Sequence, residues 1–192
     1  MTTARYANQI ETLVRNYRRQ VSLPWEDNLA GAQKVWFAVY PPRHERRLRL
    51  RIPDFAHEAQ AAGHAWVLLD ITNAFPQWLA QKDYRESYFE DPTNLTGPEL
   101  DQFREHLVST LIAQMTAETV TNHTVVAMLG VGTLFGIVPM AEVIKSIAPH
   151  VRGRLMVLFP GVYERNTYRL LDAAVAWNYL AVVIPSDEGA TA

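Results

Sequence analysis

The chain has no cysteine, no long apolar run and no large excess of charge of one sign. Among its 192 residues the absence of cysteine excludes disulfides, thiolate nucleophiles and zinc sites built on cysteine. The start of the chain, MTTARYANQIETLVRN, lacks the apolar core of a signal peptide, and no apolar run approaches the roughly 20 residues that a membrane helix needs. The formal charge of -2 gives no general attraction to nucleic acid or to a membrane. These absences predict a cytoplasmic protein with no membrane partner.

The common motifs of catalysis are also missing. The sequence contains no G-x-S-x-G nucleophile elbow and no H-E-x-x-H metal motif. Its six histidines are scattered along the chain rather than paired at metal-ligand spacing, and each is better explained as a surface or core residue. We therefore expect no enzyme, no catalytic residue, no metal site and no cofactor.

Residues 124–161 form the most regular part of the sequence. An apolar, β-branched run ends at a glycine turn, an amphipathic segment follows, and a second apolar run ends at Phe159-Pro160-Gly161. This order is typical of a strand, a crossover helix and a parallel neighbouring strand. Because ligands on open α/β sheets tend to bind beyond the carboxyl ends of the strands, residues 130–136 and 159–163 are the expected binding edge.

Similar patterns elsewhere predict the remaining elements. Apolar runs predict strands at 35–40, 65–71, 167–171 and 179–184, with the first two buried and the last two paired antiparallel to each other. Helical spacing predicts helices at 4–21, 43–63, 74–89 and 98–116, the second of them kinked or divided at Pro53. We expect an α/β fold, with one domain over 1–192, a mostly parallel and possibly mixed sheet of about five strands, and helices on both faces. Residues 1–32 would form an amino-terminal helix and linker, and 186–192 a flexible tail.

Three glycines, Gly130, Gly132 and Gly136, follow the central strand. Backbone amides in such a loop, at the amino end of a helix, can bind an anion, so these glycines are candidate ligand-binding residues. The loop lacks the lysine and serine or threonine of a Walker loop, and its third glycine comes one residue too late for a dinucleotide fingerprint. A tight turn packed by hydrophobic residues is the alternative explanation.

Five arginines between Arg43 and Arg51 form the densest basic cluster of the chain. Within it Arg43, Arg46 and Arg47 are candidate contacts to nucleic acid or to an acidic partner. Carboxylates nearby in the sequence stand within pairing distance on a helix, and no aromatic residues are interleaved to stack on bases. A solvated helix face is the alternative explanation.

Residues 84–91 mix aromatic and charged side chains ahead of Pro92. Aromatic residues and arginine are favoured in interface hot spots. The candidate partner-binding residues of this segment are Tyr84, Arg85, Tyr88 and Phe89. An equally good explanation is that one face of the segment belongs to the core.

Seven segments follow one another along residues 35–185, namely VWFAVY, PPRHERRLRLRIPDF, HAWVLLDIT, QWLAQKDYRESYFEDP, MLGVGTLFG, RGRLMVLFPGVYERNTYRLLDA and WNYLAVVIP. In this order they closely resemble the BrxB family of bacteriophage exclusion (BREX) systems. The resemblance implies a small cytoplasmic component of a multi-gene bacterial defence system, which blocks phage replication and marks host DNA by methylation.

The resemblance also implies partners. In such a system a methyltransferase, a large ATPase and an alkaline-phosphatase-like protein of the PglZ type look like the enzymes. The resemblance implies an accessory protein that associates with these members, above all with the PglZ-like protein. It would contact DNA only indirectly, through the complex. The family supplies no catalytic residues. Its recurring segments are matched at Glu86 and Gly161 and at further candidate partner-binding positions, which are Phe135, Phe159, Pro160, Tyr163, Tyr168 and Arg169.

Three functions remain open from the sequence. The leading expectation is a non-enzymatic accessory or assembly component of the anti-phage complex, acting by protein-protein interaction. The alternatives are a nucleotide-responsive regulatory subunit that uses Gly130 to Gly136 and a subunit that contacts DNA through Arg43 to Arg51.

Overall fold

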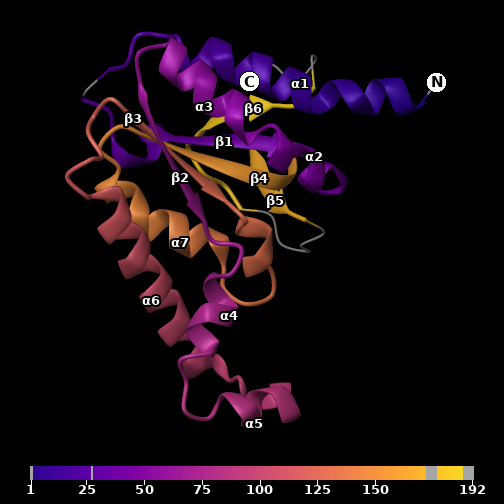
Figure 1. Ribbon diagram of the computed structural model, residues 1–192, viewed down its shortest axis with the longest axis vertical. Coiled ribbons are helices and arrows are strands. Elements are labelled where there is room, and N and C mark those ends of the chain that lie inside the picture. The colour runs from indigo at the N-terminus through magenta and orange to yellow at the C-terminus, as the bar shows by residue number, and fades with distance from the viewer. Residues whose placement is uncertain (1, 27, 172–176, 188–192) are drawn as a thin grey trace.

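Six strands of the described residues form one sheet, and helices join most of them (Figure 1). The computed structural model describes residues 2–26, 28–171 and 177–187, and for residues 2–8 the helical backbone alone. The strands are β1 (Val35–Tyr40), β2 (Ala65–Asp70), β3 (Thr124–Leu129), β4 (Arg154–Glu164), β5 (Thr167–Leu170) and β6 (Val182–Pro185). The α-helices are α1 (Thr2–Val21), α2 (Glu45–Leu50), α3 (Ile52–Ala61), α4 (Ala74–Leu79), α5 (Arg85–Glu90), α6 (Gly97–Met115) and α7 (Met140–Ile147). Short 3-10 helices are η1 (Gly31–Lys34), η2 (Pro42–His44), η3 (Pro92–Asn94), η4 (Val131–Leu134) and η5 (Ala148–His150).

The sheet is mostly parallel. Its strands run in the order β2-β3-β4-β1-β6 with parallel pairing throughout, and β5 is antiparallel to β4. The predicted α/β fold with a mixed sheet is confirmed. So is the strand, crossover helix and parallel strand of residues 124–161, because β3 and β4 are neighbours and α7 lies between them in the chain.

The prediction that the last two strands pair with each other is wrong. β5 folds back on β4 through a turn at Arg165 and Asn166, whose positive φ angles of 50° and 63° suit a tight hairpin. β6 instead pairs in parallel with β1. The reason is the length of β4, which continues past the end of β1 and leaves residues 161–164 with an edge on which β5 can form its hydrogen bonds.

Alternate residues of β1 point into two separate cores. Val35, Phe37 and Val39 join the core that includes α6 and α7, whereas Trp36 and Tyr40 join the core that includes α1 and α3. All six side chains of the strand are buried, as expected of an apolar run covered on both faces. Figure 1 shows α1 and α3 on one face of the sheet and α6 and α7 on the other, which confirms that helices cover both faces.

The prediction that β2 is a buried strand is wrong. Within the described sheet β2 lies at the end of the strand order and pairs with β3 alone. Leu69 is buried, but its neighbour Leu68 is 39% exposed. An apolar run of six or seven residues does not distinguish a central strand from an edge strand, because that difference is set by the topology.

Two predicted helices are divided. α2 ends at Leu50 and α3 begins at Ile52, with Pro53 in the first turn of α3, where its missing N–H costs no hydrogen bond. The helix predicted over 74–89 is also two helices, since α4 ends at Leu79 and α5 begins at Arg85. The break between α4 and α5 lies where the chain leaves the body of the protein (Figure 1).

Helix α1 holds the carboxyl-terminal part of the described chain. Asn16 Nδ2 donates a hydrogen bond to the carbonyl of Pro185 at 2.8 Å, and Gln9 Nε2 donates to Asp187 Oδ1 at 2.7 Å. Ser186 is buried. The first two residues of the predicted tail 186–192 are therefore in contact with the fold, and residues 188–192 lie outside the described residues.

Trp25 fixes the segment between α1 and β1 to the amino-terminal edge of the sheet. Its ring stacks on His64, with centroids 3.6 Å apart and planes 7° apart, and the guanidinium carbon of Arg154 lies 4.6 Å from the ring centroid. His123 stacks beyond His64 at 6.3 Å. Burial first, and then the neighbouring His123 and Arg154, lower the pKa of His64.

Acidification below about pH 6.5 is expected to destabilise the fold through His64, because 6.5 is the ordinary histidine pKa. The pKa of His64 is lower in the folded chain than in the unfolded chain. Below about pH 6.5 the unfolded chain therefore binds more protons, and the free energy of unfolding decreases as the pH decreases. Chemical denaturation across this range should show a flatter dependence in His64→Asn. His44 acts in the same direction, because burial and then Arg43 and Arg47 lower its pKa. An unchanged slope in His64→Asn would assign the effect to other groups.

Candidate functional site

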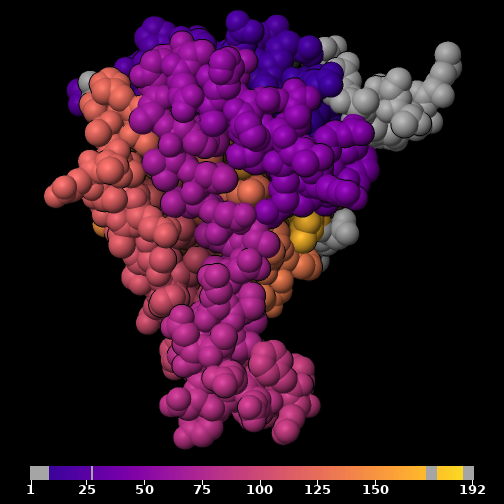
Figure 2. Space-filling model, viewed as in Figure 1, coloured from indigo at the N-terminus to yellow at the C-terminus, as the bar shows by residue number. Residues whose placement is uncertain are grey.

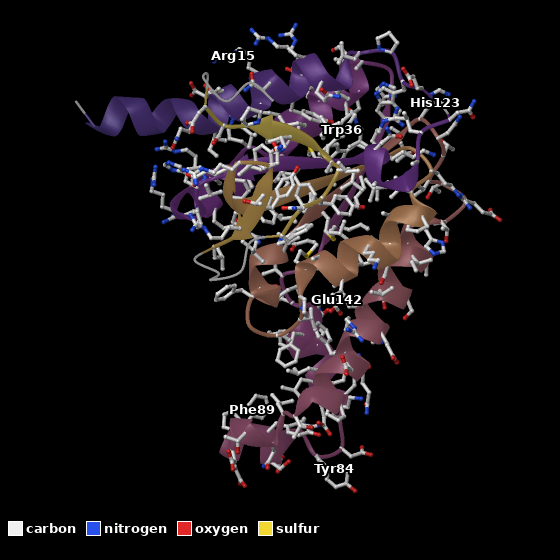
Figure 3. All side chains as sticks on the ribbon, turned by 180° about the vertical axis from the view of Figure 1, so that it is seen from behind. Arg15, Trp36, Tyr84, Phe89, His123 and Glu142 are labelled. Carbon is white, nitrogen blue, oxygen red and sulfur yellow. The ribbon has the colours of Figure 1, made fainter. Side chains whose placement is uncertain are left out.

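Residues 80–96 form a projection that extends away from the body of the protein (Figures 1 and 2). The projection consists of α5, η3 and the segments that join them to α4 and α6. Tyr84 is 76% exposed and Phe89 is 70% exposed, the largest values among the described aromatic side chains. Figure 3 shows both at the end of the molecule remote from the sheet. Arg85 and Glu86 are exposed beside them.

The projection is anchored to the body by packing, and a hydrogen bond holds its own parts together. Tyr88 is half-buried and packs against the core that includes α6. Asn94 Nδ2 donates to the carbonyl of Ser87 at 3.2 Å, which ties η3 to α5. Three rings pack where the projection joins the body, with centroids 5.0 to 6.1 Å apart, and they belong to Phe75, Trp78 and Phe103. The segment that carries the exposed aromatic side chains is therefore held in place by packing against the body of the protein.

Two of the predicted partner-binding residues belong to the core, so their assignment to a contact surface is wrong. Phe159 and Tyr168 are both 0% exposed. Their ring centroids lie 5.9 Å apart, and both rings pack against Phe37 and Trp177. β4 and β5 turn these two side chains inward, and a residue with no exposed surface cannot contact a partner without unfolding.

Three of the other candidates at this edge lie at or near the surface. Phe135 is 46% exposed at the rim of an apolar cavity of about 410 Å³, which Ile137, Met140, Leu170 and Trp177 also line. Tyr163 is half-buried and its hydroxyl donates to Asn166 Oδ1 at 3.1 Å. Arg169 is exposed. The predicted partner-binding residue Pro160 is buried in β4, as is Gly161, so it too offers a partner little surface.

A second cavity lies at the carboxyl ends of the parallel strands. The chain leaves β1 toward α2 and α3 on one face and leaves β3 toward α7 on the other, with β4 between them. Such a reversal opens a crevice in α/β sheets, and ligands bind there in many proteins of this class. The cavity measures about 380 Å³ and is lined by residues that include Pro42, Glu45, Arg49, Thr72, Gly132, Thr133 and Pro160. It lies at the edge that the sequence predicts.

Two carboxylates neutralise the arginine of this second cavity. Arg49 donates from Nε to Glu45 Oε1 at 2.8 Å, from Nη1 to Asp70 Oδ2 at 3.3 Å and from Nη2 to Thr72 Oγ1 at 2.7 Å. The hydroxyl of Tyr40 donates to the other oxygen of Glu45. Burial tends to raise the pKa of Asp70, but hydrogen bonds from Thr72 and the charge of Arg49 outweigh burial and lower it. The local charge is therefore negative, which disfavours a phosphate ligand.

Sequence spacing signals only part of this network. Glu45 and Arg49 stand at i and i+4 of one helix, and this spacing predicts their ion pair. The contact of Arg49 with Asp70 joins α2 to the end of a strand 21 positions along the chain, and only the fold brings them together. Among the described residues, no cluster of histidine and carboxylate side chains is arranged to hold a metal ion.

The glycine loop forms a tight turn. Gly130 has a φ of 91° and Gly136 a φ of 75°, values that favour glycine. Four backbone amides of the loop already donate to carbonyls within it, and they belong to Thr133, Phe135, Ile137 and Val138. Val131 and Leu134 are buried. This geometry agrees with the alternative explanation of a turn packed by hydrophobic residues, and it leaves few amides for a phosphate.

The arginine cluster divides into two groups. Arg49 and Arg51 pair with carboxylates, Arg51 with Asp54 and with Glu11. Arg43, Arg46 and Arg47 are exposed, and Arg43 Nη2 also donates to Gln9 Oε1 at 3.4 Å. The second group is the part of the cluster that a partner could reach.

No helix among the described residues has the length and apolar character needed to span a membrane. Comparison with protein-family models, with curated proteins and with solved structures finds no match.

Proposed function

We propose that the protein is a non-enzymatic assembly component of a cytoplasmic bacterial anti-phage complex of the BREX type, and that it acts by binding the PglZ-like member. The observation that carries the proposal is the projection, which packs against the core at Tyr88 and holds Tyr84 and Phe89 in solvent. The resemblance of residues 35–185 to the BrxB family supplies the kind of complex and the choice of partner.

Large aromatic side chains in solvent are costly unless a partner covers them. Tyrosine, tryptophan and arginine dominate binding hot spots, because they bury much area for few rotatable bonds. One short segment carries a tyrosine and an arginine of this kind, Tyr84 and Arg85, together with the aromatic ring of Phe89. The absence of a catalytic motif in the sequence agrees with a binding role.

Changing both Tyr84 and Phe89 to alanine is expected to weaken binding to the PglZ-like protein by at least about tenfold, since each truncation removes a candidate hot spot. Pull-down followed by calorimetry with the purified PglZ-like protein measures this change. Leu23→Ala is the matched control, because Leu23 is 54% exposed in the linker, away from the projection.

The possible outcomes test the assembly role and the position of the binding surface separately. Absence of any complex between the unaltered chain and the PglZ-like protein would refute the choice of partner. Absence of complexes with the other members of the system as well would refute the assembly role. If the Tyr84 and Phe89 double variant forms a normal complex, the assembly role stands but the partner binds a different surface. The cavity rim at Phe135 would then be tested by Phe135→Asp.

A further inference from the structure

Charge is segregated between the two ends of the molecule. Residues 82–105, which include most of the projection, contain three basic and seven acidic residues, for a net charge of -4. Residues 1–52 contain ten basic and four acidic residues, for a net charge of +6. Asp54, Glu58 and Asp70, which follow in the chain, form ion pairs with Arg51, Arg18 and Arg49, so the positive excess of this end is smaller than the charge of residues 1–52.

The acidic end has a defined contact face on α5. Glu86, Phe89 and Glu90 are all exposed and stand at spacings of three and four, which places them on one side of the helix. Asp83 and Tyr84 are exposed just ahead of the helix. The face therefore combines the ring of Phe89 with two carboxylates, and Asp83 and Tyr84 add a carboxylate and a ring next to it in the chain.

The basic end has a matching face on η2 and α2. Arg46, Arg47 and Leu50 are exposed on α2, where Leu50 follows the two arginines by four and three residues on the same side of the helix, and Arg43 is exposed in η2 just before it. Leu50 is 75% exposed, whereas Leu48 on the opposite side is fully buried. We call these four residues the arginine stripe.

The two faces are complementary in charge and in chemistry. Carboxylates of α5 can pair with the guanidinium groups, the rings of Tyr84 and Phe89 can lie on guanidinium planes, and Leu50 offers the apolar contact. Within one molecule they lie far apart, with α5 at one end and α2 beside α1 toward the other (Figure 1). A contact between them requires a second copy.

We propose that the projection of one copy docks on the arginine stripe of another. The contact joins two different surfaces, so each copy keeps one free face of each kind and the assembly grows head to tail. Two short helices bury less than a stable dimer needs, which makes the association weak and dependent on concentration. This inference does not rest on the proposed function, but it uses the same projection, so a second copy would compete with the PglZ-like protein for Tyr84 and Phe89.

Sedimentation velocity of the purified chain tests the proposal. At about 50 mM salt the mean mass should rise with protein concentration above the 21.8 kDa of one copy, and at about 500 mM salt it should return to that value, since salt screens exposed charges. A mass of 21.8 kDa at every concentration and both salt levels overturns the proposal.

Charge reversal identifies the contact. Arg46→Glu with Arg47→Glu removes the stripe, and Glu86→Arg with Glu90→Arg removes the acidic face, so each double variant alone should remain monomeric. An equimolar mixture restores opposite charges at both contacts, native between the unaltered faces and reversed between the altered ones, so association should return. Self-association of either double variant alone, or a mixture that stays monomeric, overturns the proposal.

Matched controls separate this contact from general charge effects. Glu118→Arg with Lys145→Glu changes exposed charges of both signs on other elements, and association should persist. All four substitutions of the test variants lie on exposed side chains, so thermal unfolding should match that of the unaltered chain. If the unaltered chain stays monomeric while a short DNA duplex binds it and Arg46→Glu with Arg47→Glu abolishes that binding, the stripe serves nucleic acid and the proposal falls.

Discussion

Replacing Phe159 by alanine is expected to lower the free energy of unfolding by about 3 to 5 kcal/mol, the usual cost of removing a large side chain from a packed core. The side chain is 0% exposed, and its ring centroid lies 5.3 Å from that of Phe37 and 5.9 Å from that of Tyr168. The truncation would leave a cavity beside Phe37. β1 and β4 cannot easily shift to close it, because their backbones are hydrogen-bonded within the sheet. Urea denaturation measures the change.

Phe89→Ala is the matched control for this prediction. It makes the same change in side chain at a position that is 70% exposed, so the free energy of unfolding should change by no more than about 0.5 kcal/mol. For binding to the partner we expect the opposite, with Phe89→Ala weakening the complex more than Phe159→Ala. Similar stability losses in the two variants would contradict the division into core and projection.

Gly130→Ala is expected to lower the free energy of unfolding by about 3 kcal/mol or more. Its φ of 91° disfavours any side chain, and an added Cβ would lie 2.6 Å from Thr72 Oγ1 and 2.7 Å from the backbone nitrogen of Thr72. Relief would require β2 and β3 to separate where their ends meet. Denaturation of the purified variant measures the loss.

Gly63→Ala isolates the contribution of the backbone angle. Gly63 has a φ of 84°, but an added Cβ would meet nothing within 4 Å, so the expected loss is only about 1 to 2 kcal/mol. The difference between the two glycines is the steric part at Gly130. Equal losses would show that the loop moves away from Thr72 at little cost, and that close packing is not what requires glycine at position 130.

Local pattern was sufficient for most of the elements. The run VWFAVY predicts β1 to the residue, because six apolar side chains between polar and proline boundaries have few other solutions. Pro53 predicts the division between α2 and α3, because proline is tolerated in a first turn and not in a helix interior. The glycine turn and the amphipathic segment after it predict the crossover from β3 to β4.

Strand order was beyond the reach of local pattern. The run AWVLLDI has the same apolar character as VWFAVY, yet β2 lies at the edge and β1 lies inside. β5 and β6 follow one another in the chain and pair with different strands, because β4 is long enough to supply an edge for β5. Pairing depends on distant segments, which a window of the sequence does not contain.

The candidate sites divide in the same way. The chemistry of each segment follows from the sequence, namely the aromatic and charged residues of 84–91, the arginines of 43–51 and the glycines after the central strand. Tertiary structure alone decided which of these side chains reach solvent, exposing Tyr84 and Phe89 while burying Phe159 and Tyr168. It also placed Asp70 against Arg49. The physical reason is that exposure belongs to the packed whole, since each aromatic ring lies inside or outside according to what other elements cover it.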